Sequence, residues 1–141
     1  MGEPVVLREG VAEDWAGFRE LIQQSDGAAT WADGYPSIVA ESGGRLLGFA
    51  MYRVVAGEGE LLNLAVDPLA RRTGLGRALL QEMMQLAEVW HLEVRESNAA
   101  AIALYASLGY KQVGRRSGYY GDSEAALLFS YFALKQENWP L

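Results

Sequence analysis

The chain has 141 residues and a net charge of −6, and 50% of its residues are hydrophobic while 21% are charged, so it can bury the core of one domain. With no cysteine, a disulfide scaffold, a thiolate metal site and a cysteine nucleophile are excluded, and the single histidine, His91, leaves little for a metal cluster or a serine triad. The acidic balance disfavours nucleic-acid binding, and no apolar run predicts a membrane span. We expect a single cytoplasmic domain over residues 1–141, with no metal.

The first half of the chain predicts one helix among several strands. Trp15, Phe18, Leu21 and Ile22 recur at helical spacing, and Ser42-Gly43-Gly44 between two apolar runs is typical of a hairpin. The intervening stretch at 25–36 is rich in Gly, Ala and Asp and predicts a loop. The expected elements are strands at 5–8, 37–41, 46–55 and 60–66, and a helix at 13–24.

The second half predicts two helices and three strands. Leu75, Leu79, Met83 and Leu86 share one face of a long helix. The elements are helices at 75–88 and 98–108, with Asn98 at the start and Gly109 as the C-cap of the second, and strands at 89–95, 110–116 and 125–133. This order predicts an α/β (α+β) fold, a mixed sheet with helices on its faces.

A glycine turn between the strand at 60–66 and the long helix is the most informative segment. Gly74 and Gly76 open the helix, where free N–H groups and the positive end of the dipole favour a phosphate. Arg71, Arg72 and Arg77 add positive charge to an otherwise acidic chain. A plain turn with a solvated basic surface is the alternative. Neither the G-x-G-x-x-G of a dinucleotide fold nor the G-K-[ST] of a P-loop is present.

The turn and the segments around it resemble the GNAT superfamily of N-acetyltransferases. R-x-x-G-x-G, formed by Arg71, Gly74 and Gly76, is similar to the pyrophosphate-binding motif of that superfamily. Within it, the chain most resembles the ribosomal-protein-alanine N-acetyltransferases of the RimI type, over roughly the C-terminal two thirds. The stretches that carry this resemblance are 62–68, 74–80, 92–102, Leu104-Tyr105, Leu108-Gly109-Tyr110, Arg115-Arg116 and Tyr119-Tyr120.

The resemblance implies a fold and a cofactor site. The implied GNAT fold is a mixed, mostly antiparallel sheet of about six to seven strands, with splayed central strands and helices on both faces. Acetyl-CoA would enter the gap between those strands, with its pyrophosphate on the glycine turn. The residues implied in cofactor binding are Leu64, Ala65, Val66, Arg71, Arg72, Thr73, Gly74, Leu75, Gly76, Arg77, Asn98 and Tyr105.

Two residues are candidates for the chemistry of acetyl transfer to an amine. Glu93 is an acid in the middle of an apolar strand, where it needs a partner or a task, and a carboxylate can act as general base. Tyr105, in the helix that follows, can protonate the departing thiolate. The resemblance implies the same two roles. The alternatives are a Glu93 paired with Arg95 or Arg53 and a Tyr105 that only packs. His91 lies on the same face as Glu93 and is interpreted as a packed or hydrogen-bonded histidine.

The acceptor is expected to be a primary amine, and the resemblance favours the N-terminal α-amino group of a ribosomal protein. It also implies that Tyr119 and Tyr120 line the acceptor site; aromatic cover for a sheet edge is the alternative. Other N-termini, lysine, a small amine, or a non-catalytic CoA-binding module are the competing functions. The chain departs from the family around Trp31 and at the abrupt connection 86–90, which predicts a shortened helix. We expect a monomer or a weak homodimer.

Overall fold

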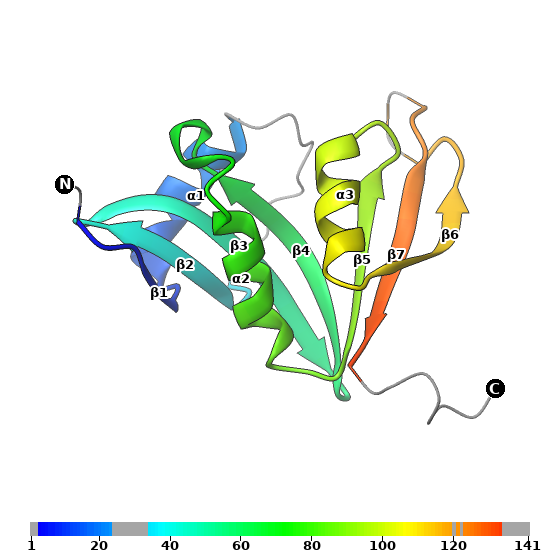
Figure 1. The fold of residues 1–141 in the computed structure, drawn as a ribbon, viewed down its shortest axis with the longest axis horizontal. Coiled ribbons are helices and arrows are strands. Elements are labelled where there is room, and N and C mark those ends of the chain that lie inside the picture. Colours follow the sequence, from blue (N-terminus) through cyan, green and yellow to red (C-terminus); the bar gives the residue numbers. More distant parts are fainter. Residues whose placement is uncertain (1–2, 24–33, 120, 122, 134–141) are drawn as a thin grey trace. The chain divides into compact units, whose positions relative to one another are not determined.

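The computed structural model describes residues 3–23, 34–119, 121 and 123–133, and these residues form a mixed α/β fold (Figure 1). The sheet has seven strands in the order β1-β2-β3-β4-β5-β7-β6. The elements are β1 (Val6–Glu9), η1 (Ala12–Asp14), α1 (Trp15–Gln23), β2 (Ser37–Ser42), β3 (Arg45–Val55), β4 (Glu58–Val66), η2 (Pro68–Ala70), α2 (Leu75–Met84), β5 (Val89–Arg95), α3 (Ala99–Ser107), β6 (Lys111–Arg116) and β7 (Ala126–Phe132).

The strands begin and end within two residues of the predicted positions, and the predicted hairpin is confirmed. Gly43 and Gly44 form its two-residue turn, with φ of 57° and 80°, and Ser42 pairs with Arg45 beside them. This is the turn whose twist matches a hairpin and which glycine adopts without a steric penalty.

The long helix is shorter than the predicted range of 75–88, as the abrupt connection before β5 indicated. α2 ends at Met84 rather than near residue 88, with Gln85 as its C-cap. Leu75, Leu79 and Met83 are buried as predicted, whereas Leu86 is 51% exposed. The short connection before β5 accounts for this, because the chain must leave the helix early to reach Val89.

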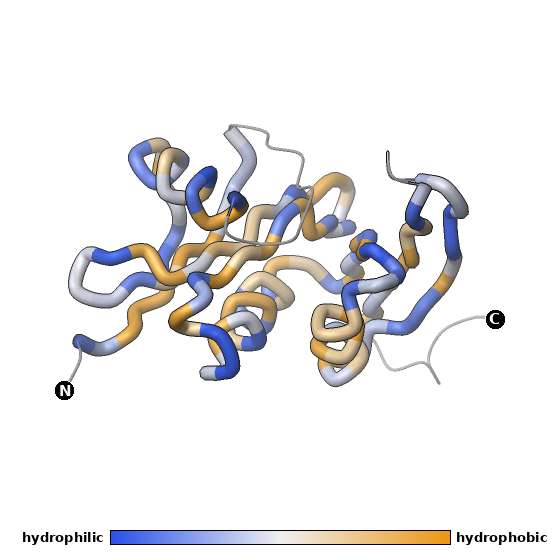
Figure 2. Tube along the Cα trace, turned by 90° about the horizontal axis from the view of Figure 1, so that it is seen from above, coloured by the Kyte–Doolittle hydropathy of each residue, from blue (hydrophilic) through white to orange (hydrophobic). Residues whose placement is uncertain are grey.

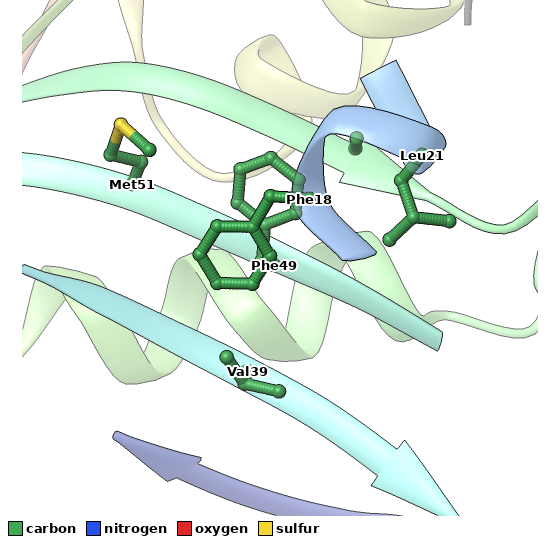
Figure 3. Packing of buried hydrophobic residues seen from close by; sticks show 6 residues of the cluster. Phe18, Leu21, Val39, Phe49 and Met51 are labelled. Carbon is green, nitrogen blue, oxygen red and sulfur yellow. The ribbon is translucent and has the colours of Figure 1, made fainter. Parts of the chain in front are cut away.

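The described residues fall into two compact units, and the first contains Met1–Arg53 with Leu61–Leu86. One face of its sheet is covered by α1. Phe18 and Phe49 are fully buried and stack with ring centroids 4.1 Å apart, and Val39 and Met51 belong to the same cluster (Figure 3). The spacing that predicted α1 from the sequence is therefore the spacing of its buried face.

α2 covers the opposite face of the same strands. A Cβ on Gly48 would lie 3.2 Å from Cδ1 of Leu79 and 2.9 Å from the carbonyl oxygen of Ala65. Only glycine allows α2 and β4 to approach β3 this closely. Helices on both faces of this unit, as expected from the resemblance, are visible in Figure 1, with α2 in front of the strands and α1 behind.

The second unit contains Val54–Glu60 with Ala87–Leu141, so the first residues of β4 belong to it. β4 and β5 run parallel and pair from Glu58 with Val89 to Glu60 with His91. β5 and β6 both pair antiparallel with β7. Of these strands, β6 is the most hydrophilic in Figure 2, and five of its six residues are exposed.

The two faces of the sheet in the second unit differ sharply. Trp90, Leu92 and Val94 are buried on one face, and a Cβ on Gly59 would lie within 2.4 Å of the Trp90 ring. The other residues of β5, among them His91 and Glu93, are only half-buried. The charged residues of β5 thus share the face that the indole does not occupy.

None of the helices in the described part of the chain is both long and apolar enough to cross a membrane. The organisation of residues 1–141 as one domain, the splaying of the central strands, the oligomeric state and the cytoplasmic location stay predictions.

Candidate active site

The glycine turn has the backbone geometry of an anion site. Gly74 is the N-cap of α2, with φ of 84° and no side-chain cap, and Arg72 also adopts a positive φ, 64°. The left-handed region costs an L-residue about 1–2 kcal/mol, so a strained arginine beside a glycine cap is a sign of function. The first N–H groups of a helix have no intrahelical acceptor, and those of α2 begin here. Thr73 braces the turn by donating its hydroxyl to the Ala70 carbonyl, 2.5 Å away.

Asp67 connects this turn to the sheet. Its Oδ1 accepts from the Leu69 N–H and its Oδ2 from Nη2 of Arg45, both at 2.8 Å, while its own N–H donates to the Leu47 carbonyl. The hydrogen bonds that its carboxylate accepts, that of Leu69 above all, and the charges of Arg45 and Arg71 lower the pKa of Asp67. Asp67 is 8% exposed, so a buried carboxylate positions the start of the loop.

An apolar hollow of about 580 Å³ borders the same turn within the first unit. Leu7, Leu47 and Leu75 contribute to its wall, and Thr73 and Gly74 form part of its rim. This hollow could not be predicted from the sequence, because its wall combines β1, β3 and α2.

The residues of the turn fit a pyrophosphate. Arg71, Arg72, Thr73 and Gly74 are exposed, and no heavy atom lies within 4 Å of the place that a Cβ on Gly74 would occupy. An anion can therefore reach the backbone there, with arginine side chains on the same loop. Leu64 and Val66 are half-buried in β4, which leads into this loop, and Ala65 is buried between them.

Glu93 lies on the half-buried face of β5 and has two partners. Nη1 of Arg116 is 3.6 Å from its Oε1, and the phenol of Tyr119 donates a hydrogen bond to it, which raises the pKa of Tyr119. The Arg116 guanidinium also lies 5.4 Å from the centroid of the Tyr119 ring. Arg95, which the sequence offered as an alternative partner, binds Glu124 at 2.9 Å.

Tyr105 lies on the opposite face of the sheet. It is 6% exposed in α3, its ring is 5.8 Å from that of Tyr110, and the Tyr110 ring is 5.5 Å from that of Tyr131. Tyr131 pairs with Trp90, and paired residues of neighbouring strands share a face. The second unit thus holds Glu93 on one face and Tyr105 on the other.

The remaining predicted residues have separate positions. Asn98 is the N-cap of α3, as expected, and its Oδ1 accepts from the Ala101 N–H at 3.2 Å. Tyr119 is 45% exposed. Tyr120 and Trp31 lie outside the described residues.

The hydrogen-bond partners of His91 could not be predicted from the sequence. His91 lies between Oγ of Ser130 and Oε1 of Glu58, at 2.7 Å from each, so its interpretation as a hydrogen-bonded histidine is confirmed. Its partners are 39 and 33 residues away and belong to β7 and β4. The alternation of β5 predicted that His91 and Glu93 share a face, but no local pattern indicates which strands lie beside them.

Comparisons with known proteins agree with this geometry. The sequence profile of the acetyltransferase (GNAT) family matches residues 8–110. The [ribosomal protein bS18]-alanine N-acetyltransferase of Escherichia coli K12 is 43% identical over 103 residues, 69% of each chain. The N-alpha-acetyltransferase RimI of Mycobacterium tuberculosis is 44% identical over 92 residues, 61% of this chain and 58% of its own.

A solved structure is similar over nearly the full length. The crystal structure of the ribosomal-protein-S18-alanine N-acetyltransferase from Escherichia coli superposes with a TM-score of 0.83 at 32% identity, over 98% of this chain and 100% of that one. The chain belongs to the acetyltransferase (GNAT) family. It is an N-acetyltransferase that takes its acetyl group from acetyl-CoA. Among the described residues, no three His, Cys, Asp or Glu side chains are grouped as a metal site would require.

Proposed function

We propose that the enzyme acetylates the N-terminal α-amino group of a ribosomal protein. The observation that carries the proposal is the placement of Glu93, a half-buried carboxylate on the sheet face opposite Tyr105, in a chain 43% identical to a ribosomal-protein-alanine N-acetyltransferase. An α-amino group has a pKa of about 8, so removing its extra proton near neutral pH costs little free energy, and a carboxylate in contact with it can accept that proton.

Glu93 acts as the general base in this proposal. Its carboxylate accepts the proton of the acceptor ammonium, directly or through a water molecule, on the face that also carries Tyr119. The Tyr119 phenol and the Arg116 guanidinium hold the carboxylate in place beforehand. Acetyl-CoA supplies the acetyl group as a thioester, so no covalent intermediate on the enzyme is needed.

Tyr105 acts as the general acid. A thiolate leaving group resembles that of cysteine, with a pKa of about 8.5, and a phenol is acidic enough to protonate it. With base and acid on opposite faces of one sheet, the amine enters from one side and the thiol leaves on the other. The N–H groups at the end of the Leu64–Val66 segment would polarise the reacting carbonyl.

The cofactor residues complete the proposal. The turn from Arg71 to Arg77 binds the pyrophosphate through its N–H groups and arginine side chains, and Asn98 contacts the cofactor near the start of α3. Tyr119, with Tyr120, lines the acceptor site.

The test is a panel of acceptors offered to the purified protein with acetyl-CoA, with thiol release and product mass as readouts. The panel contains the N-terminal peptide of the ribosomal protein named for the relatives, unrelated N-termini, an internal-lysine peptide and polyamines. Acetylation confined to the ribosomal peptide supports the full proposal. Acetylation of another amine replaces the acceptor, and CoA binding without turnover on any amine favours a non-catalytic binding module.

A further inference from the structure

A line of hydrogen bonds crosses three strands on the half-buried face of the second unit. Ser130, on β7, lies 2.7 Å from Nδ1 of His91, on β5, and Glu58, on β4, lies 2.7 Å from Nε2. A carboxylate accepts only, so Nε2 carries a hydrogen. In a neutral imidazole Nδ1 is then the acceptor, and the Ser130 hydroxyl donates to it.

This arrangement allows His91 to gain a proton without losing a hydrogen bond. When Nδ1 is protonated it donates to Oγ of Ser130, because a hydroxyl both donates and accepts. Nε2–H continues to donate to Glu58, whose charge now balances that of the imidazolium. A serine at one nitrogen of an imidazole with a carboxylate at the other is the arrangement of a proton acceptor.

The line ends at a cavity that also contains Glu93. The cavity has a volume of about 170 Å³, and its wall includes His91, Glu93 and Ser130. A cavity of this volume has room for water. Ser130 is 4% exposed, so its hydroxyl is reached mainly from this side.

The charged groups around the imidazole come from every strand beside it. Glu58 and Glu60 face it from β4, and Glu93 follows it on β5. Lys111, on β6, pairs with Ser130 on the far side of the line. Nη1 of Arg116 lies 3.6 Å from Oε1 of Glu93. Three carboxylates, one ammonium group and one guanidinium group therefore surround the site, and a proton taken up there meets net negative charge.

We propose that His91 stores the proton that leaves the acceptor ammonium, and that Ser130 and Glu58 position it for this role. The inference rests on the proposed function. The ammonium gives its proton to Glu93 or to water in the cavity. Ser130 then receives a proton at Oγ while its own hydrogen passes to Nδ1 of His91. The sum is R–NH3⁺ plus imidazole giving R–NH2 plus imidazolium, and the half-exposed ring returns the proton to solvent. His91 holds the proton, and Ser130 and Glu58 are the positioning residues.

The first experiment compares the pH dependence of kcat/KM for wild type, His91→Gln and Ser130→Ala. A glutamine can still donate to Glu58 and accept from Ser130 but cannot titrate. We expect both variants to lose about tenfold in kcat and to change the pH profile of kcat/KM, with an unchanged KM for acetyl-CoA. Lys111→Gln, a charge change beside the line, is the control and should stay within about twofold. Wild-type kcat and pH profile in both variants would overturn the proposal.

A second measurement is independent of turnover. His91 is the only histidine of the chain, so its ring protons can be followed by NMR without assignment. In Glu58→Gln the ring should hold less of the added proton than in wild type at the same pH, because the stabilising carboxylate is gone. If wild type acetylates no amine, the proposed function fails, but this measurement still tests the hydrogen bonds between Ser130, His91 and Glu58. An unchanged titration in Glu58→Gln would overturn the proposal.

Discussion

The glycine turn before α2 and the charged face of β5 are built in different ways. The turn is local, since Gly74, Arg72 and the Asp67 brace lie within eight residues. The charged face is assembled from β4, β5, β6 and β7, and the partners of His91 are 33 and 39 residues away. A motif can therefore reveal the first region, whereas only the strand pairing reveals the second. The comparison also predicts that changes in the turn alter cofactor affinity and that changes on β5 alter turnover.

The largest effect is expected for Glu93→Gln. The amide keeps the shape of the side chain and cannot take a proton, so kcat should fall by about 10²–10⁴-fold. The Kd for CoA, measured by calorimetry, should stay within about twofold. Glu96→Gln is the matched control, because Glu96 pairs with Arg115 at 2.8 Å in an exposed ion pair and should keep wild-type turnover. A Glu93→Gln enzyme of normal activity would remove Glu93 as the base.

Tyr105→Phe should have the next largest effect. Loss of the phenolic proton should lower kcat by about 10- to 100-fold, at the low end for general acids because a thiolate leaves readily. Tyr110→Phe is the control, since its ring lies 5.8 Å from that of Tyr105 and its buried hydroxyl has no hydrogen-bond partner among the described residues. That variant should keep full turnover and full stability. Equal losses in both variants would indicate a packing role for Tyr105.

Gly74→Ala tests whether the glycine turn contributes to CoA binding. The new methyl group meets no atom, but a φ of 84° is unfavourable for alanine, so the turn relaxes and the Kd for CoA should rise about tenfold. Gly57→Ala is the matched control, because Gly57 also has a positive φ, 82°, and open space around it. Both variants should lose about 1 kcal/mol of stability in thermal unfolding. An equal loss of CoA affinity in Gly57→Ala would contradict the role of the turn.

Asp67→Asn is expected to have the smallest effect, and one that depends on pH. The pKa of Asp67 is lowered in the folded protein, so its contribution to stability is full above the unfolded value of about 3.9 and is lost as the pH falls through the folded value. Wild type should exceed the variant by about 1–2 kcal/mol at neutral pH, and the difference should shrink in acid. Denaturant unfolding at several pH values measures this, and a difference that grows in acid would contradict the assignment.

The fold could be predicted from the sequence wherever a pattern was local. The period of Trp15, Phe18 and Leu21 predicted α1, the two glycines predicted the first hairpin, and Asn98 and Gly109 predicted both ends of α3. The end of α2 was predicted only in outline: the apolar period continues to Leu86, whereas the abrupt connection to β5 indicated a shorter helix, and the chain leaves the helix at Met84.

In the candidate site, too, the residues that belong to local patterns were predicted and the contacts between strands were not. Gly74 and the arginines were recognisable because helix starts have their own chemistry, and Glu93 stood out as an acid in an apolar strand. The Tyr119 and Arg116 contacts to Glu93, and the Ser130 and Glu58 contacts to His91, depend on which strands pair and in what register. Charge and alternation within a single strand do not contain that information.

The central claim is that the acetyl group goes to an α-amino group. The most direct measurement offers the enzyme two versions of one ribosomal N-terminal peptide that contains a lysine, one with a free and one with a blocked N-terminus, and records thiol release. We predict release with the free peptide, an acetyl group located on its first residue by fragmentation, and only background release with the blocked one. Equal release from both peptides would place the acetyl group on lysine and contradict the account.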